Sequence, residues 1–268
     1  MIDTHCHLTF PELHDRLDDV LDAARHAGVD RMITIGTTPE SSRHAADLAA
    51  AHGHVFATAG VHPHEAGKHH DRTALLDPLR ETLARPGVVA IGEMGLDTHY
   101  DDPPLADQKR VFAWQLELAA DHPDLPVVIH NREATDDTLT VLRESGLPGE
   151  RFVFHCFTGM PAEADAILDF GACVGFTGVV TFKSAADVAE ASDRVPLERL
   201  LIETDAPFLT PEPHRKVRPN EPCYVRHVAA FLADRRGMAL DDFTAATDAN
   251  AERLFDLPPK ASTKGNSG

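Results

Sequence analysis

The sequence predicts an α/β fold, a single-domain (β/α)8 barrel of the TIM-barrel type. Short β-rich runs alternate with longer segments of helical periodicity from one end of the 268 residues to the other. Eight such runs can be counted, and one barrel of this kind needs about 250 residues. We therefore expect one domain over residues 1–257, with its functional site at the carboxyl ends of the strands.

The predicted strands are short apolar runs, and several of them stop abruptly at a residue that can bind a metal ion. In order along the chain they are Ile2–His7, Arg31–Gly36, Val55–Val61, Val88–Glu93, Val127–His130, Phe152–His155, Ala172–Phe176 and Leu200–Asp205.

Helical patterns fill the intervals between these strands. In the first interval, apolar residues recur at helical spacing from Leu13 to Ala24, which predicts a helix with one buried face. Thr38-Pro39 and Met160-Pro161 each place a proline at the first position of a helix. The longest pattern covers Pro104–Ala120.

A proline-rich loop, Pro207–Pro222, follows the last predicted strand. Two helical patterns come next, Tyr224–Arg235 and Leu240–Phe255, and we expect the last helix of the barrel and a helix that covers it. Residues 258–268 are polar and have nothing to bury, so we expect a disordered tail there.

The composition restricts the classes of partner. Asp and Glu outnumber Lys and Arg by 43 to 25, and the formal charge is −18. Such a body repels nucleic acid, so a polyanionic substrate would need positive charge supplied locally, for instance by bound cations. The four cysteines show no Cys-x-x-Cys spacing, and no run approaches the length of a membrane span. We expect a cytoplasmic protein with no membrane association and no stable protein partner.

Ligand-type residues close several of the predicted strands. In a (β/α)8 barrel the carboxyl ends of all strands meet at one face, where active sites are built. His5 and His7 project to the same side of their strand because side chains alternate. The residues that converge at this face are His5, His7, Glu93, His130, His155 and Asp205.

Each of these residues alone has an ordinary structural explanation, since a single histidine at a strand end is more often hydrogen-bonded than metal-bound. Their coincidence at one face favours a metal site, and the set is large enough for two divalent ions. Two such ions bring +4 against −2 from Glu93 and Asp205, which leaves a charge of about +2 and suits a phosphate.

Other residues at this face have two interpretations each. His62 either contacts substrate or orders its loop. Arg132 either binds two oxygens of a phosphate with its guanidinium or pairs with a local carboxylate. Lys183 either binds substrate or is simply solvated. Cys6 and Cys156 stand next to ligand histidines, but strand alternation predicts that both turn away from the site.

With these residues in place, the chain resembles the TatD family of metal-dependent deoxyribonucleases, within the amidohydrolase-like superfamily, from Ile2 to about Leu257. The blocks that carry the resemblance are Asp3-Thr4-His5-Cys6-His7-Leu8, Gly60-Val61-His62-Pro63-His64, Gly92-Glu93-Met94-Gly95-Leu96-Asp97, His130-Asn131-Arg132, His155-Cys156-Phe157-Thr158-Gly159 and Glu203-Thr204-Asp205-Ala206-Pro207-Phe208-Leu209.

The resemblance implies a ligand assignment. His5, His7 and Asp205 would hold one ion, His130 and His155 the other, and Glu93 would bridge them. The chain departs from the family at Thr98-His99, where aromatic residues are common, and in the loop 213–222, which lacks a glycine after its arginine.

We accordingly expect hydrolysis of a phosphodiester bond in DNA, from a strand end, by a water activated by two divalent ions (Mg, Mn or Zn). Asp205 would orient this water and manage its proton, with Glu93 as the other catalytic carboxylate. Single-stranded DNA and RNA remain open as substrates. One alternative is an amidohydrolase or deacylase acting on an amide, ester or aminoacyl bond; another is a protein whose metals only stabilise the barrel.

Overall fold

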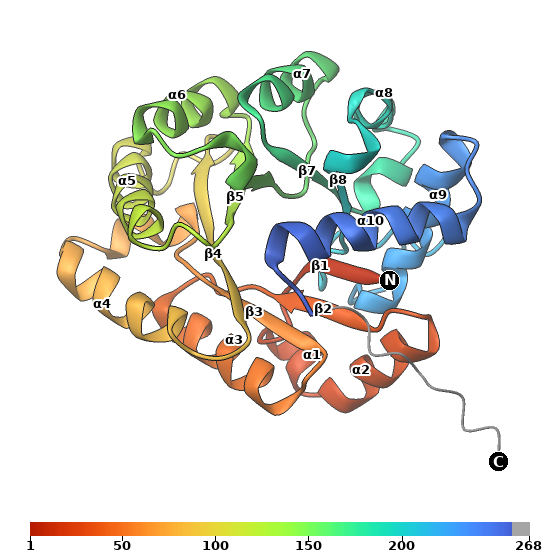
Figure 1. The fold of residues 1–268 in the computed structure, drawn as a ribbon, viewed down its shortest axis with the longest axis horizontal. Coiled ribbons are helices and arrows are strands. Elements are labelled where there is room, and N and C mark those ends of the chain that lie inside the picture. The colour runs from red at the N-terminus through yellow and green to blue at the C-terminus, as the bar shows by residue number, and fades with distance from the viewer. Residues whose placement is uncertain (259–268) are drawn as a thin grey trace.

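Eight parallel strands pair in sequence order, from β1 to β8, in the computed structural model, which describes residues 1–258 (Figure 1). The strand bounds are β1 Ile2–Cys6, β2 Arg31–Thr34, β3 Val55–Ala59, β4 Val88–Asp97, β5 Val127–Arg132, β6 Phe152–Phe154, β7 Cys173–Phe176 and β8 Leu200–Ile202. Helices surround the strands, so the predicted (β/α)8 barrel is confirmed. Of the predicted tail, residues 259–268 lie outside the described part of the chain.

The helices follow the predicted alternation. Their bounds are α1 Pro11–His14, α2 Leu17–His26, α3 Pro39–Ala51, α4 Arg72–Leu83, α5 Leu105–Asp121, α6 Thr135–Ser145, α7 Pro161–Phe170, α8 Ala186–Arg194, α9 Val225–Arg235 and α10 Leu240–Phe255. The Thr38 hydroxyl accepts a hydrogen bond from the Ser41 amide and caps α3, and Pro39 occupies the first turn, as the sequence predicts.

Several strand ends differ from the prediction. β6 and β8 end at Phe154 and Ile202, before the ligand-type residues that the sequence places inside them, whereas β4 continues four residues further to Asp97. At Asp205 the backbone takes a left-handed conformation with φ of 54°, which takes it out of an extended strand. His155 and Asp205 therefore project from the loop that follows each strand.

The barrel closes between β1 and β8 beside these loops. The Asp205 amide donates to the His5 carbonyl at 2.9 Å, and the His7 amide donates to the Ala206 carbonyl at 2.7 Å. Cys6 and Ala206 form a parallel bridge between these two bonds. Closure thus holds the first and last ligand-type residues next to each other.

The apolar core has two parts. The larger cluster packs the strands against the surrounding helices. The smaller one fills the barrel interior with residues such as Ile2, Ile33 and Phe56, and α10 adds Phe255 to it. Figure 1 shows α10 lying across the barrel next to β1, so the covering helix that the sequence predicts is present. No helix within residues 1–258 is long and apolar enough to cross a bilayer.

Candidate metal centre

Glu93 stands at the centre of the histidine cluster. Its Oε1 atom lies 2.7 Å from Nε2 of His155, 2.8 Å from Nδ1 of His130 and 3.4 Å from Nε2 of His62. Its Oε2 atom faces the other way and lies 3.5 Å from Nε2 of His5. One buried carboxylate therefore reaches imidazoles from β1, β5 and the loops after β3 and β6.

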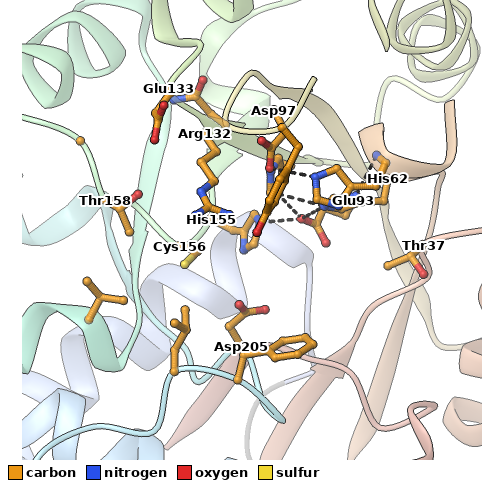
Figure 2. Close-up of a pocket in the computed structure, with 18 of the residues that line it drawn as sticks. Thr37, His62, Glu93, Asp97, Arg132, Glu133, His155, Cys156, Thr158 and Asp205 are labelled. Atoms are coloured by element: carbon orange, nitrogen blue, oxygen red, sulfur yellow. Dashed lines mark hydrogen bonds and ion pairs between the residues drawn. The ribbon is translucent and has the colours of Figure 1, made fainter. Parts of the chain in front are cut away.

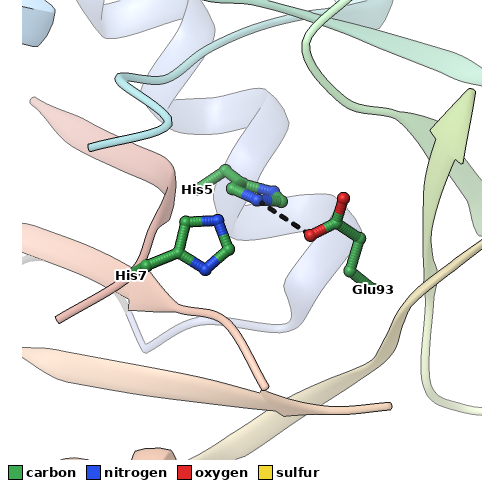
Figure 3. Close-up of side chains that lie close together, drawn as sticks. All are labelled: His5, His7 and Glu93. Atoms are coloured by element: carbon green, nitrogen blue, oxygen red, sulfur yellow. Dashed lines mark ion pairs between the residues drawn. The ribbon is translucent and has the colours of Figure 1, made fainter. Parts of the chain in front are cut away.

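The first group of ligand atoms combines His5 of β1, His7 directly after β1, and Glu93 of β4. His5 and His7 both face Glu93, as Figure 3 shows, and one ligand atom from each of the three lies within 4.8 Å of the others. Asp205 joins them, because its Oδ1 atom lies 3.2 Å from Nε2 of His7 and 3.6 Å from Nε2 of His5. The strand alternation that places both histidines on one side of β1 is thus observed.

The second group contains His62 and His130 together with Glu93. Nε2 of His62 and Nδ1 of His130 lie 3.1 Å apart, both beside Oε1 of Glu93. Nε2 of His155 lies 3.4 Å from the same His130 nitrogen. His62, which the sequence predicts as a substrate contact or a loop residue, therefore lies at ligand distance from the cluster.

Several ring nitrogens in the cluster lack a hydrogen-bond partner. Within residues 1–258, both nitrogens of His5 and the Nδ1 atoms of His7 and His155 are buried without one. Burying an unpaired polar atom costs free energy, and a divalent ion would supply the missing partner. Imidazole nitrogens with carboxylate oxygens are a donor set that suits zinc or manganese. The residues present therefore fit a divalent metal.

Two histidines of the cluster differ in protonation. Burial and, next, the nearby His155 lower the pKa of His5 to about 3, so its imidazole is neutral and its lone pair is available. Burial acts in the same direction on His155, but attraction to Glu93 outweighs it and raises the pKa of His155 to about 9. A metal ion that binds Nε2 of His155 must displace this proton.

Two acidic residues that sequence reasoning missed support the histidines. Oδ2 of Asp97 lies 3.0 Å from Nε2 of His130 and 3.0 Å from Nε2 of His64. Oε1 of Glu203 lies 3.7 Å from Nδ1 of His155 and accepts the backbone N–H of Cys156. Burial raises the pKa of Glu203 to about 7.

Both residues had a signal in the sequence. Glu93 and Asp97 are an even number of residues apart, so they share a face if the strand continues beyond Glu93, as it does. Glu203 belongs to the same short segment as Asp205, close to the strand end.

A cavity of about 840 Å³ opens over the cluster (Figure 2). Glu93, Asp205, His155 and Arg132 all line it. Glu133, the carboxylate next to Arg132 in the sequence, pairs with Nδ1 of His99 at 2.7 Å. The Arg132 guanidinium lies over the ring of Tyr100, 5.3 Å from its centroid.

Cys6, Cys156 and Lys183 differ in how they lie relative to the cavity. Cys6 is fully buried against β2, as expected, but the expectation that Cys156 turns away is wrong, because Cys156 lines the cavity. It lies beyond the end of β6, with φ of 47°, where strand alternation no longer applies. Lys183 is exposed and does not line the cavity, so its substrate contact stays a prediction.

This combination of fold and site is that of the metal-dependent hydrolases built on a (β/α)8 barrel. The model of the family described as TatD related DNase matches residues 2–256. The chain therefore belongs to the TatD family.

Relatives match the chain over nearly its whole length. It is 39% identical over 267 residues to the 3'-5' ssDNA/RNA exonuclease TatD of Musicola paradisiaca (strain Ech703), covering 97% of this chain and 99% of the relative. It is 38% identical over 255 residues to the uncharacterized metal-dependent hydrolase YabD of Bacillus subtilis (strain 168), covering 95% and 98%.

A solved structure agrees with this assignment. The crystal structure of YjjV, a TatD homologue from Escherichia coli K12, superposes with a TM-score of 0.90 and 33% sequence identity, covering 96% of this chain and 98% of that one. The family and the fold that the sequence predicts are confirmed.

Proposed function

We propose that the protein is a metal-dependent deoxyribonuclease that removes nucleotides from the end of a strand. The observation that carries the proposal is the position of Glu93, whose two oxygens belong to two groups of ligand atoms. A carboxylate placed in this way fits a pair of divalent ions. In a chain of charge −18, such a pair also supplies the local positive charge that a polyanionic substrate needs.

The distances support one division of ligand roles. His5, His7 and Asp205 would hold one ion, His130 and His155 would hold the other, and Glu93 would contribute to both. His62 lines the cavity and contacts the phosphate from the β3 side. With four imidazoles among the ligands, we propose manganese or zinc rather than magnesium as the resident metal.

The reaction needs an activated water and a stabilised phosphate. Divalent ions in such a site polarise the phosphate oxygens and acidify a water molecule. Asp205 borders the cavity and faces His7, so it is placed to orient the attacking water and to accept its proton. Burial raises the pKa of Asp205, but hydrogen bonding to His7 more than offsets it, so the carboxylate stays ionised and accepting.

Arg132 binds the substrate from a different side of the cavity than Asp205. Arg132 ends β5 and Asp205 follows β8, three strands further along the barrel, so the two side chains approach the bound phosphate from different sides. Within residues 1–258 the guanidinium makes no ion pair with a carboxylate, and its planar fork is free to bind two phosphate oxygens.

The substrate is nucleic acid, with single-stranded DNA as the first choice and RNA as the second. The relative from Musicola paradisiaca bears the name of a 3'-5' ssDNA/RNA exonuclease, which supports a reaction of this kind here. The four cysteines are all free thiols, which supports the cytoplasm as the place of action.

The test is cleavage of end-labelled oligonucleotides by chelator-treated protein after reloading with manganese, zinc or magnesium. Single-stranded DNA, RNA and duplex DNA, each labelled at one end or the other, report the substrate and the direction of cleavage. We expect stepwise shortening of single-stranded DNA that a chelator abolishes. If no metal restores cleavage of any nucleic acid while an amide or aminoacyl ester is hydrolysed, the proposal is wrong and the deacylase alternative holds.

A further inference from the structure

Four cations gather beyond the carboxyl ends of β7 and β8, outside the cluster of ligands. Lys183 follows the 3-10 helix η3 (Gly178–Thr181), and the other three belong to the loop between β8 and α9. All four are exposed, and we call them the basic track: Lys183, Arg215, Lys216 and Arg218.

The basic track differs from the rest of the acidic surface. Within residues 1–258, none of its four members makes an ion pair with a carboxylate, whereas Arg194 and Arg235 elsewhere pair with Asp165 and Asp193. Of the four acids in the same loop, Glu203 contacts His155, Asp205 contacts His7, and Glu221 is already engaged by Arg16. The fourth, Glu212, makes no ion pair with a cation within residues 1–258. The positive charge of the track is therefore available to a ligand.

The loop that carries the track is held in one shape by hydrogen bonds. The Thr210 hydroxyl donates to the Val217 carbonyl at 2.9 Å, and the Glu212 amide donates to the Thr181 hydroxyl at 2.9 Å. The Arg215 guanidinium lies 4.0 Å from the centroid of the Phe182 ring, next to Lys183. These contacts join the loop to η3, so the four cations occupy defined neighbouring positions.

The basic track lies next to residues that line the edge of the cavity. Val179 of η3 and Phe208 and Leu209 of the loop line the cavity. Nη1 of Arg218 lies 3.1 Å from Oγ1 of Thr210, the residue after Leu209. Phe208 is 48% exposed, so its ring offers a face to a flat apolar group at this rim.

We propose that the basic track binds the backbone phosphates of the part of a single strand that extends out of the cavity, while the ring of Phe208 stacks on an unpaired base at the rim. This inference rests on the proposed nuclease function and names the path of its substrate. Binding of single strands combines cationic side chains along the backbone with aromatic rings under the bases. A duplex cannot place one base on Phe208 without unpairing, so the arrangement selects single strands.

The experiment compares two double variants on oligothymidylates that increase in length from the dinucleotide to the hexadecamer. The test variant is Lys183→Glu with Lys216→Glu, because neither side chain makes a hydrogen bond or ion pair within residues 1–258. The matched control is Arg43→Glu with Arg143→Glu, which changes the charge equally on the exposed faces of α3 and α6.

We expect the test variant to lower kcat/KM on the hexadecamer by about tenfold or more, through KM. On the shortest oligomer that the unchanged protein cleaves, the loss should stay within about twofold, because that substrate does not reach the track. Each lost phosphate contact should also reduce the slope of log(kcat/KM) against log[salt] by about 0.7 on long substrates.

Two results would contradict the proposal that the basic track binds the substrate strand. One is an equal loss on the shortest and longest oligomers, and the other is a loss in the control variant as large as in the test variant. Failure of the proposed function is distinguishable, because the unchanged protein would then cleave no oligomer of any length. In that case the proposed role of the basic track would also be wrong.

Discussion

Oδ2 of Asp97 lies 3.0 Å from Nε2 of His130, while the other ring nitrogen of His130 lies 2.8 Å from Oε1 of Glu93. The carboxylate therefore accepts the Nε2 proton and directs the Nδ1 lone pair toward the centre of the cluster. Burial raises the pKa of Asp97, but hydrogen bonds from His130 and His64 more than offset it, and the pKa lies below its ordinary range. An ionised Asp97 therefore selects one tautomer of His130, which we propose as a metal ligand.

Replacing Asp97 by Asn should weaken metal binding without removing any ligand. An amide donates as well as accepts and no longer selects the tautomer, and loss of such a supporting partner typically costs about tenfold to 100-fold in metal affinity. Calorimetric titration of the chelator-treated protein with manganese measures the change. Asp101→Asn, at an exposed position on the loop after β4, is the matched control and should bind as the unchanged protein does. Equal affinity in both variants would remove Asp97 from this role.

Asp205→Asn should abolish turnover while the barrel remains folded. Asn keeps the shape of the side chain but cannot accept a proton from the attacking water, and removing a general base of this kind costs about 10² to 10⁴ in rate. Single-turnover cleavage of end-labelled single-stranded DNA measures the loss, and circular dichroism checks the fold. Full activity in this variant would contradict the role of Asp205 as the group that accepts the proton of the attacking water.

Removal of metal should lower the melting temperature, because the unpaired ring nitrogens of His5 and His7 then lose their partner. A ligand that binds only the folded state at 100 times its Kd stabilises it by about 2.7 kcal/mol. Thermal melts with chelator, and again after manganese is restored, measure the difference. The double variant His5→Ala with His7→Ala should show a much smaller dependence on metal, and a dependence as large as that of the unchanged protein would contradict the assignment.

The barrel and most of the ligand cluster could be predicted because two local signals coincide in the sequence. Apolar runs identify the strands, and ligand-type residues such as His5 and His130 close them, so the convergence at one face follows from the topology. The predicted strand ends differ from the observed ones where the chain stops pairing with the neighbouring strands. His155 and Asp205 lie after the observed ends of β6 and β8, where the bends depend on neighbouring loops.

The supporting contacts depend on pairs of residues far apart in the sequence. Asp97 supports His130 only because the register of β4 and β5 places Gly95 next to His130 and Asp97 next to Arg132. Strand alternation predicts the wrong side for Cys156 because β6 ends at Phe154, before the alternation reaches that residue. Distances across the barrel of this kind are set by packing, which a pattern within one segment does not contain.

Gly60→Ala should both destabilise the fold and disturb the metal centre, because Gly60 packs directly against the backbone beside Glu93. A methyl group at Gly60 would lie 2.5 Å from Cα and from the carbonyl carbon of Gly92, and backbone atoms cannot move aside as a flexible side chain can. Overpacking of this kind costs about 1–3 kcal/mol, and any shift of Gly92 displaces the adjacent Glu93. The control is Gly53→Ala, where a methyl group meets nothing within 4 Å, so its stability should change by less than about 0.5 kcal/mol. Urea denaturation and manganese titration of both variants test the prediction. If Gly60→Ala lost stability but bound manganese with unchanged affinity, the close contact between Gly60 and Gly92 would have no part in positioning Glu93.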